Sequence, residues 1–152
     1  MMKTCEALRR RMFALAGCDW TGEVCFKKGE ELSLLMDGER LTVEAPDISA
    51  AARGLFLAAC TLRDGKNIPE LHQTRHIASC GMMLDMSRGG VMTVQAVKGM
   101  IDAHAALGLN LMMLYTEDTY TVPEAPYLGY LRGRYTEKEL REMDDYAAES
   151  GV

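Results

Sequence analysis

The sequence predicts an α/β fold in two parts, a small α+β domain at residues 1–72 and an alternating strand–helix region at residues 73–152. In the first part, short apolar runs separated by turn residues lie between two helical patterns, as in a small sheet covered by helices. In the second part, strand-length apolar runs alternate with helical patterns in the order βαβα, which implies a parallel sheet with right-handed crossovers. The chain has 152 residues, whereas a closed eight-unit βα barrel needs about 250.

The first part begins with a helix at residues 4–16, where apolar side chains recur at helical spacing and Gly17 ends the pattern. Three consecutive arginines at residues 9–11 predict a solvated face of this helix rather than a binding patch. The apolar runs that follow predict three short strands, at residues 24–26, 32–35 and 41–43.

Turn and cap signals predict the remaining elements of the first part. Asp37-Gly38 separates the last two strands and is a strong hairpin signal. Asp47 is the predicted N-cap of a helix at residues 48–62 that is rich in Ala and Leu. Residues 66–74 then predict the connection to the second part.

The second part opens with a mostly apolar run at residues 77–86, whose length and composition predict a buried strand. Thr93 caps a predicted helix at residues 94–107, and Gly108 closes it. Residues 110–115 predict a second buried strand of the same sheet.

A long loop at residues 116–135 follows, and Thr136 with Glu139 forms a capping box that starts a helix running to about residue 150. Two parallel strands with their helices cannot bury both faces of a sheet. We therefore expect further chain or a partner to cover it, and the exposed sheet edges predict a homo-oligomer as one outcome.

Composition excludes several classes of function. The net charge is -5 and no basic stripe occurs, so nucleic acid is a poor candidate partner. The five cysteines are an odd number without a C-x-x-C pair, which indicates reduced thiols and predicts a cytoplasmic protein. The sequence lacks a signal peptide and any run of about 18 apolar residues, so we expect neither secretion nor a membrane partner.

The candidate site lies where the two predicted parallel strands end, because α/β folds bind ligands at the carboxyl ends of strands. Asp85 and Arg88 end the first strand, and an arginine fork can bind two sugar hydroxyls at once. A salt bridge between Asp85 and Arg88 that only ties down the loop is the structural alternative.

Glu117 and Asp118 end the second strand. On an extended segment their side chains point to opposite faces, so only one enters a pocket easily. Adjacent carboxylates also do not make the facing pair that glycoside hydrolysis requires across the scissile bond. One of them is expected to position a ligand, and a surface acid is the alternative.

The remaining polar and aromatic candidates are weaker. His72, His76 and His104 have no metal-ligand spacing and predict structural or solvated histidines, so no metal site is expected. The loop tyrosines could stack on sugar rings or pack the loop onto its domain, and the sequence leaves both open; they are Tyr120, Tyr127, Tyr130 and Tyr135.

Five segments carry a resemblance to a known family. Residues 83–88 read Met-Leu-Asp-Met-Ser-Arg, and residues 115–118 read Tyr-Thr-Glu-Asp. With residues 106–110, 132–136 and 144–147, they resemble the first two barrel strands and the entry to the third in family 20 glycoside hydrolases, the β-N-acetylhexosaminidases. The usual His of the second strand is Tyr115 here.

The resemblance implies a small α/β domain at residues 1–72 followed by the first βα units of an incomplete TIM-type (β/α)8 barrel at residues 73–152. It implies removal of terminal N-acetylhexosamine from glycans, without a metal or organic cofactor. Arg88 would bind the hydroxyls of the terminal sugar beside Asp85, and Glu117 or Asp118 would support the site.

In that family the acetamido oxygen of the substrate attacks the anomeric carbon, and an Asp-Glu pair at the end of the fourth strand orients and protonates the substrate. We expect that pair to lie beyond this chain, so no residue here is expected to be catalytic and the fragment is expected to be inactive alone. Two alternatives stay open: a non-catalytic α/β sugar-binding or assembly module, and another barrel enzyme whose first strand ends in Asp-x-Ser-Arg.

Overall fold

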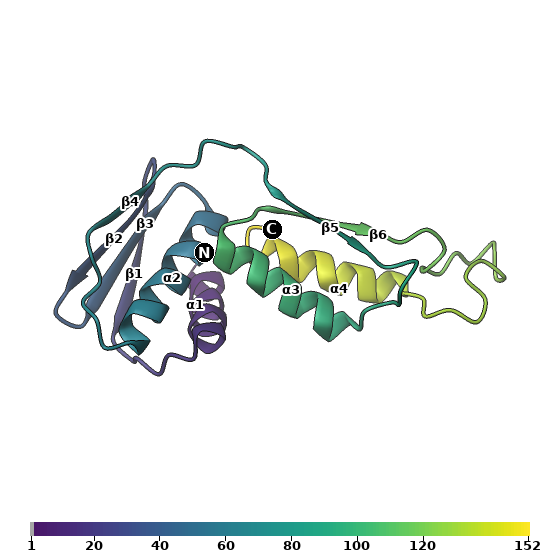
Figure 1. Cartoon of the computed structure of the whole chain (residues 1–152), viewed down its shortest axis with the longest axis horizontal. Coiled ribbons are helices and arrows are strands. Elements are labelled where there is room, and N and C mark those ends of the chain that lie inside the picture. The colour runs from purple at the N-terminus through teal and green to yellow at the C-terminus, as the bar shows by residue number, and fades with distance from the viewer. Residues whose placement is uncertain (1) are drawn as a thin grey trace.

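Two separate sheets and two pairs of helices make up residues 2–152 in this computed structural model (Figure 1). Helices α1 (Met2–Ala16) and α2 (Ile48–Arg63) lie between the four-stranded sheet and the end of helix α3 (Val94–Leu107). Helices α3 and α4 (Glu137–Ala148) lie beside the two-stranded sheet. The structure is therefore α/β, as the sequence predicts.

The four-stranded sheet has the order β1-β3-β2-β4. Strands β2 and β3 form the antiparallel hairpin that Asp37-Gly38 predicts, with Asp37 paired to Arg40. Strand β1 pairs with β3 in parallel, so the sheet is mixed. The strand bounds are β1 Glu23–Lys28, β2 Leu32–Asp37, β3 Arg40–Ala45 and β4 Leu71–Gln73.

Strand β4 corrects the prediction that residues 66–74 only connect the two parts. Leu71 pairs with Leu34, and Gln73 pairs with Leu32, at the edge of the sheet. The strand has three residues, too few to show the alternation of apolar and polar side chains that marks a strand in sequence. The predicted boundary between residues 72 and 73 falls inside it, and the division into two domains stays a prediction.

The core of the first part is formed by α1, α2 and one face of the sheet, where Met12, Leu41 and Leu55 are fully buried. Ala105 and Ala106 at the end of α3 belong to the same core. The strand–helix region is thus packed directly against the first part.

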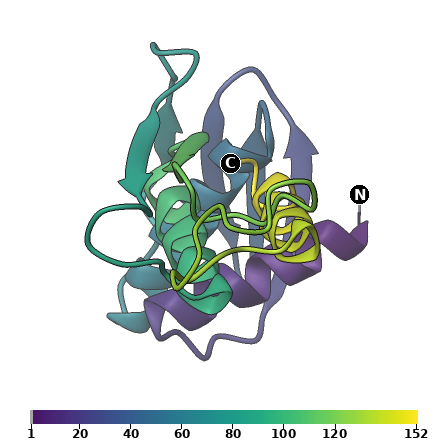
Figure 2. The ribbon, with the colours of Figure 1, turned by 90° about the vertical axis from the view of Figure 1, so that its right-hand side faces the viewer.

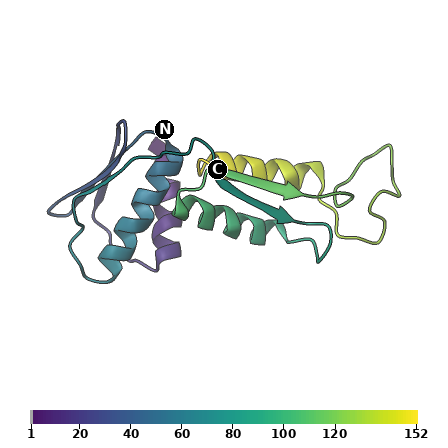
Figure 3. The same ribbon diagram turned by 45° about the horizontal axis from the view of Figure 1, so that its top comes forward.

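Strands β5 (Gly81–Asp85) and β6 (Leu111–Tyr115) run parallel and side by side, pointing away from the first sheet (Figure 3). Each helix start predicted for this half is present, since the side chains of Thr93 and Thr136 accept hydrogen bonds from backbone N–H groups in the first turns of α3 and α4. The helices cover one face of the strands with a second core of Met86, Val97, Ile101, Tyr135 and Met143.

The opposite face of β5 and β6 is open, which corrects the prediction of buried strands. Met83 and Met113 are cross-strand neighbours and are 57% and 54% exposed. Alternate residues of a strand point to opposite faces, and the helices of residues 2–152 cover only one. Strand β5 is also shorter than the predicted 77–86, and before the ladder begins the Asn110 side chain donates to the Ala78 carbonyl and accepts from Cys80 N–H.

A polar junction joins α1 to α3 and α4. Arg11 Nε donates to Asp102 Oδ1 over 2.8 Å, and Arg11 Nη2 donates to Ser150 Oγ over 2.6 Å. The Arg11 guanidinium carbon lies 3.6 Å from the centre of the Tyr146 ring, and the Tyr146 hydroxyl donates to Asp102 Oδ2 over 3.0 Å. Burial, reinforced by this hydrogen bond, raises the pKa of Tyr146 to about 12. Arg11 is therefore a largely buried anchor, and the prediction of a solvated face is wrong for it.

The cysteines at positions 5, 18, 25, 60 and 80 all carry free thiols in the structure. Within residues 2–152, no helix combines the length and the apolar character that crossing a membrane would take.

Candidate functional site

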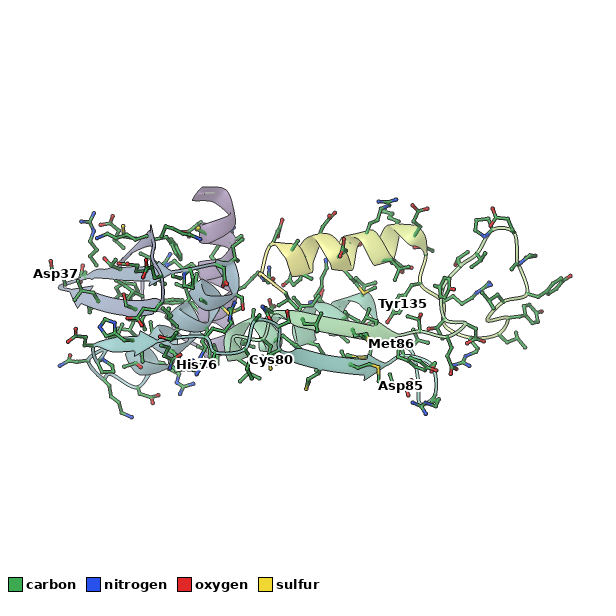
Figure 4. The ribbon with its side chains drawn as sticks, turned by 90° about the horizontal axis from the view of Figure 1, so that it is seen from above. Asp37, His76, Cys80, Asp85, Met86 and Tyr135 are labelled. Carbon is green, nitrogen blue, oxygen red and sulfur yellow. The ribbon has the colours of Figure 1, made fainter. Side chains whose placement is uncertain are left out.

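Strands β5 and β6 end next to each other, so the polar residues that follow them meet at one edge. Asp85 pairs with Tyr115 in the ladder, and Met86 N–H donates to the Tyr115 carbonyl over 2.9 Å. Figure 4 shows Asp85 and Met86 at this edge, with Tyr135 packed nearby from the loop before α4. The sequence prediction that the two strand ends share one rim is confirmed.

The Asp85 carboxylate organises the turn after β5. Its Oδ1 accepts hydrogen bonds from Ser87 N–H and Ser87 Oγ, each over 2.9 Å, and from Arg88 N–H over 3.2 Å. Its Oδ2 accepts from Arg88 Nε over 2.6 Å. The bonds from Ser87, followed by those from Arg88, hold the pKa of Asp85 far below its usual range. The salt bridge between Asp85 and Arg88 is therefore present.

The Arg88 side chain is held along one edge only. It is 73% exposed. Among the described residues, only its Nε has a hydrogen-bond partner in the protein. Its guanidinium carbon lies 5.7 Å from the centre of the Tyr115 ring, and the hydrogen bond to Asp85 raises the Arg88 pKa. The outer edge of the guanidinium is thus available to a ligand, so the salt bridge and a binding role are compatible.

Glu117 and Asp118, the two acidic residues after β6, do not lie on an extended segment. The prediction that their side chains point to opposite faces assumed such a segment, and that assumption is wrong. Glu117 has a φ of 46°, in the left-handed region, so the chain turns at this residue. Its Oε1 accepts a hydrogen bond from the Tyr115 hydroxyl over 2.8 Å, and this contact raises the pKa of Tyr115. Asp118 Oδ1 instead lies 3.2 Å from Arg132 Nη1.

These residues surround an open cavity of about 490 Å³, here called the rim hollow. Its charged lining consists of Arg88, Glu117 and Arg132, and Ser87, Gly89, Gly90, Val91 and Gly133 complete it. Of the four predicted site residues, Arg88 and Glu117 line the rim hollow, while Asp85 and Asp118 each pair with one of its arginines.

Arg132 is a site residue that the sequence reasoning missed. It lies near the end of the loop before α4, distant in sequence from both strand ends, and its pairing with Asp118 brings it to the rim hollow. The only signal was its place in the Arg-Gly-Arg segment at residues 132–134, within one of the segments that resemble the family.

The four loop tyrosines differ in exposure, and Tyr120 is partly buried and forms a backbone bridge with Tyr135. Tyr135 is buried, donates a hydrogen bond to the Met92 carbonyl over 2.5 Å and packs the loop onto the second core. Tyr127 and Tyr130 are exposed. The open choice between packing and binding is therefore settled as packing for Tyr135.

The histidines show no metal-binding arrangement in the described residues. His104 is buried, and its Nδ1 lies 2.8 Å from the Met100 carbonyl oxygen, so it is structural, as predicted. His72 is exposed between Glu31 and Glu70, and hydrogen bonds to both raise its pKa. No group of three or more His, Cys, Asp or Glu side chains within residues 2–152 could hold a metal ion.

The hydrogen bonds at Asp85 lead to a pH prediction. Since the pKa of Asp85 is lowered from 3.8, the carboxylate contributes stability above pH 3.8 that is lost as pH falls through the lower folded value. We expect Asp85 to remain ionised, and its turn intact, at pH 3.8. A pH titration of the carboxyl carbon by NMR checks this, and Ser87→Ala should move the midpoint back toward 3.8. A midpoint at or above 3.8 in the unaltered chain would contradict the hydrogen bonding.

Comparison with solved structures gives a consistent set of neighbours. A glycoside hydrolase family 20 β-N-acetylglucosaminidase aligns with 100% of this chain at 27% identity and a TM-score of 0.69. Flavobacterium johnsoniae chitobiase aligns with 96% at 22% identity and a TM-score of 0.72. Vibrio harveyi exo β-N-acetylglucosaminidase, solved in complex with N-acetylglucosamine, aligns with 98% at 18% identity and a TM-score of 0.73.

At 22% and 18% identity, the last two likenesses show the fold alone. In the order given, the chain spans 36%, 27% and 30% of the length of these three structures. No family model matches the sequence, and no curated protein matches it.

Proposed function

Since the chain has the fold of the N-terminal portion of family 20 glycoside hydrolases, we propose that it is part of an enzyme that removes terminal N-acetylhexosamine from glycans. In this proposal, β5, α3, β6 and α4 are the first two strand–helix units of a (β/α)8 barrel, and residues 1–72 are the domain that precedes it. The parallel pairing of β5 with β6 and the polar residues at their carboxyl ends support it.

The position of Arg88 is the observation that carries the proposal. Asp85 accepts a hydrogen bond from Arg88 Nε over 2.6 Å, Arg88 lines the rim hollow, and its Nη donors have no protein partner among the described residues. The fixed fork of a guanidinium fits two neighbouring hydroxyl oxygens, which is the pattern that a pyranose ring offers. We assign to Arg88 the binding of two hydroxyl groups of the terminal sugar.

The other charged residues of the rim complete this binding role. Glu117 carries an exposed carboxylate on the rim hollow, suited to accept a hydrogen bond from a sugar hydroxyl. Asp118 acts through Arg132, which also lines the rim hollow and whose Nη1 lies 3.2 Å from Asp118 Oδ1 as an ion pair without a hydrogen bond to that oxygen. Asp85 and Asp118 are thus positioning residues for the two arginines.

We assign no catalytic residue to this chain. The proposed reaction uses the acetamido oxygen of the substrate to attack the anomeric carbon, and it also needs one group to orient that oxygen and one to protonate the leaving oxygen. Glu117 and Asp118 are adjacent, and Asp85 and Asp118 are engaged with arginines. We therefore propose that residues 1–152 bind sugar without cleaving it.

Equilibrium binding tests this role. We expect the 152-residue chain to bind N-acetylglucosamine weakly and Arg88→Ala to bind it at least about tenfold more weakly, because a hydrogen bond to a charged group contributes about 1.5–3 kcal/mol. Ligand-observed NMR measures both affinities. Arg141→Ala is the matched control, since Arg141 is an exposed arginine paired with Glu137 on α4, away from the rim hollow. Equal binding by Arg88→Ala, or no binding by the unaltered chain, would contradict the proposal.

A second candidate is a non-catalytic sugar-binding or assembly module. The pairing of Asp85 and Asp118 with arginines favours it, because it leaves Glu117 as the one acidic residue in the lining of the rim hollow. Activity separates the candidates. If a longer protein that contains this chain releases the chromophore from an N-acetylglucosaminide, the enzyme is supported, and binding without release by any longer product supports the module.

The proposed ligand rests on the same likeness to family 20 glycoside hydrolases, and the proposed location rests on the free cysteine thiols. We propose a glycan ending in N-acetylhexosamine as the ligand, the cytoplasm as the location and no cofactor. The open edges and the exposed Met83 and Met113 of the two-stranded sheet support association with a second copy when nothing else covers them.

A further inference from the structure

The Tyr115 side chain connects the two strand ends that meet at the rim hollow. Tyr115 is the last residue of β6 and pairs with Asp85, the last residue of β5. Its hydroxyl donates to Glu117 Oε1 over 2.8 Å, and its ring centre lies 5.7 Å from the Arg88 guanidinium carbon. Tyr115 itself is outside the lining of the rim hollow, so it contacts two lining residues from behind.

Packing does not account for this tyrosine. Its side chain lies on the open face of the two-stranded sheet, as Met113 does, and 39% of the residue is exposed. It belongs to neither of the two cores of the described residues. The contacts of Tyr115 are therefore mainly with the polar residues of the site.

Glu117 needs such support, because its backbone is strained. A left-handed φ, here 46°, costs a residue other than glycine about 1–3 kcal/mol. Thr119 closes the turn, since its N–H and its Oγ1 donate to the Thr116 carbonyl over 2.8 and 2.7 Å. The turn leads the chain from β6 into the loop that runs across the helix ends (Figure 2). Among the described residues, the Tyr115 hydroxyl is the one hydrogen-bond donor to the exposed Glu117 carboxylate.

The charges of these side chains also influence one another. The hydrogen bond to Glu117, together with the charge of that carboxylate, raises the pKa of Tyr115, so the phenol keeps its proton and remains a donor. Asp85 is the main cause of the raised pKa of Arg88, and nearby Tyr115 and Glu117 add to it. Asp85, Arg88, Tyr115 and Glu117 thus form one continuous chain of contacts.

We infer that Tyr115 is a positioning residue, which fixes the Glu117 carboxylate relative to the Arg88 guanidinium so that both bind the same sugar ring. The inference rests on the proposed function and deepens it, since it makes neighbouring hydroxyls of one ring the recognised group. While Oε1 accepts from Tyr115, Glu117 keeps Oε2 to accept from a sugar hydroxyl, and Arg88 keeps its Nη donors.

Tyr115→Phe tests this role, because it removes the hydroxyl and keeps the ring beside Arg88. We expect this variant to bind N-acetylglucosamine about three- to tenfold more weakly, since Glu117 loses the hydrogen bond that orients it. In a Glu117→Ala background the same change should have no further effect, because no carboxylate remains to be positioned. Ligand-observed NMR measures the affinities. Tyr127→Phe is the matched control, since it removes an exposed hydroxyl that has no hydrogen-bond partner among the described residues.

Titration of the Tyr115 ring by ¹³C NMR gives a readout that a purely structural role would not change. The pKa of Tyr115 should lie above 10.0 in the unaltered chain and return toward 10.0 in Glu117→Ala. A pKa that is the same in both proteins would overturn the inference.

The binding outcomes separate the inference from the proposed function. Equal binding by Tyr115→Phe and the unaltered chain would overturn the positioning role and leave the proposed function intact. An equal loss from Tyr115→Phe with and without Glu117 would also overturn it, because the effect would not pass through the carboxylate. Absence of binding by the unaltered chain would overturn both.

Discussion

Asp102→Ala should lower the free energy of unfolding by about 2–3 kcal/mol, because it leaves the largely buried Arg11 guanidinium without its charged partner and removes the acceptor of the Tyr146 hydroxyl. Arg11 and Asp102 retain only 15% and 19% side-chain exposure, so water replaces the lost contacts poorly. The same change should loosen the packing of α1 on α3 and α4. Urea unfolding of the two proteins measures the difference.

Glu142→Ala is the matched control for this prediction. Glu142 also pairs across α3 and α4, with Lys98 Nζ at 2.7 Å, but its side chain is 48% exposed. Exposed ion pairs contribute about 0–1 kcal/mol, so the control should lose little stability. Equal losses for Asp102→Ala and Glu142→Ala would contradict a junction that fixes the two halves of the molecule together.

Gly81→Ala should separate β5 from β6 where the two strands begin, and so disturb the rim hollow that follows their carboxyl ends. A Cβ at Gly81 would lie 1.7 Å from the Leu111 carbonyl oxygen, a backbone atom that cannot move away without breaking the ladder. Overpacking of this kind costs about 1–3 kcal/mol even when side chains can adjust, and here the obstacle is main chain. Amide exchange in β5 and β6 should increase markedly, and binding of N-acetylglucosamine should fall with it.

Gly99→Ala provides the opposite expectation from the same substitution. Gly99 lies inside α3, and an added Cβ there meets nothing within 4 Å. Alanine is favoured over glycine within a helix by roughly 0.5–1 kcal/mol, so this variant should be more stable than the unaltered chain.

Unchanged amide exchange of β5 and β6 in Gly81→Ala would show that the close approach to Leu111 does not define the strand pairing.

Local signals explain what the sequence could predict of the fold. Asp47, Thr93 and Thr136 each mark a helix start, and each accepts the expected hydrogen bond from the backbone. Asp37-Gly38 likewise fixes its hairpin. These features depend on neighbours within a few residues, which a single sequence contains.

Distant contacts explain what the sequence could not predict. Strand β4 exists because it pairs with β2, some forty residues earlier in the chain. Arg11 is buried because α1 meets Asp102, 91 residues later. The spacing of apolar and polar residues within one segment does not show which distant segment pairs with β4 or with Arg11.

The candidate site shows the same division. Arg88 and Glu117 could be placed on one rim because the carboxyl ends of neighbouring parallel strands meet. Arg132 could not, because its pairing with Asp118 depends on how a 20-residue loop folds back, and the turn at Glu117 that separates the two acids depends on a left-handed φ at a non-glycine residue.

The most direct test of the account is to locate N-acetylglucosamine on the ¹⁵N-labelled chain by NMR. We expect the sugar to shift the Arg88 Nε–H signal and the amides of residues 87–90 and 117–118, which follow the two strand ends at the rim hollow. Shifts that are absent there, or that gather on the four-stranded sheet instead, would contradict the assignment of sugar binding to Arg88.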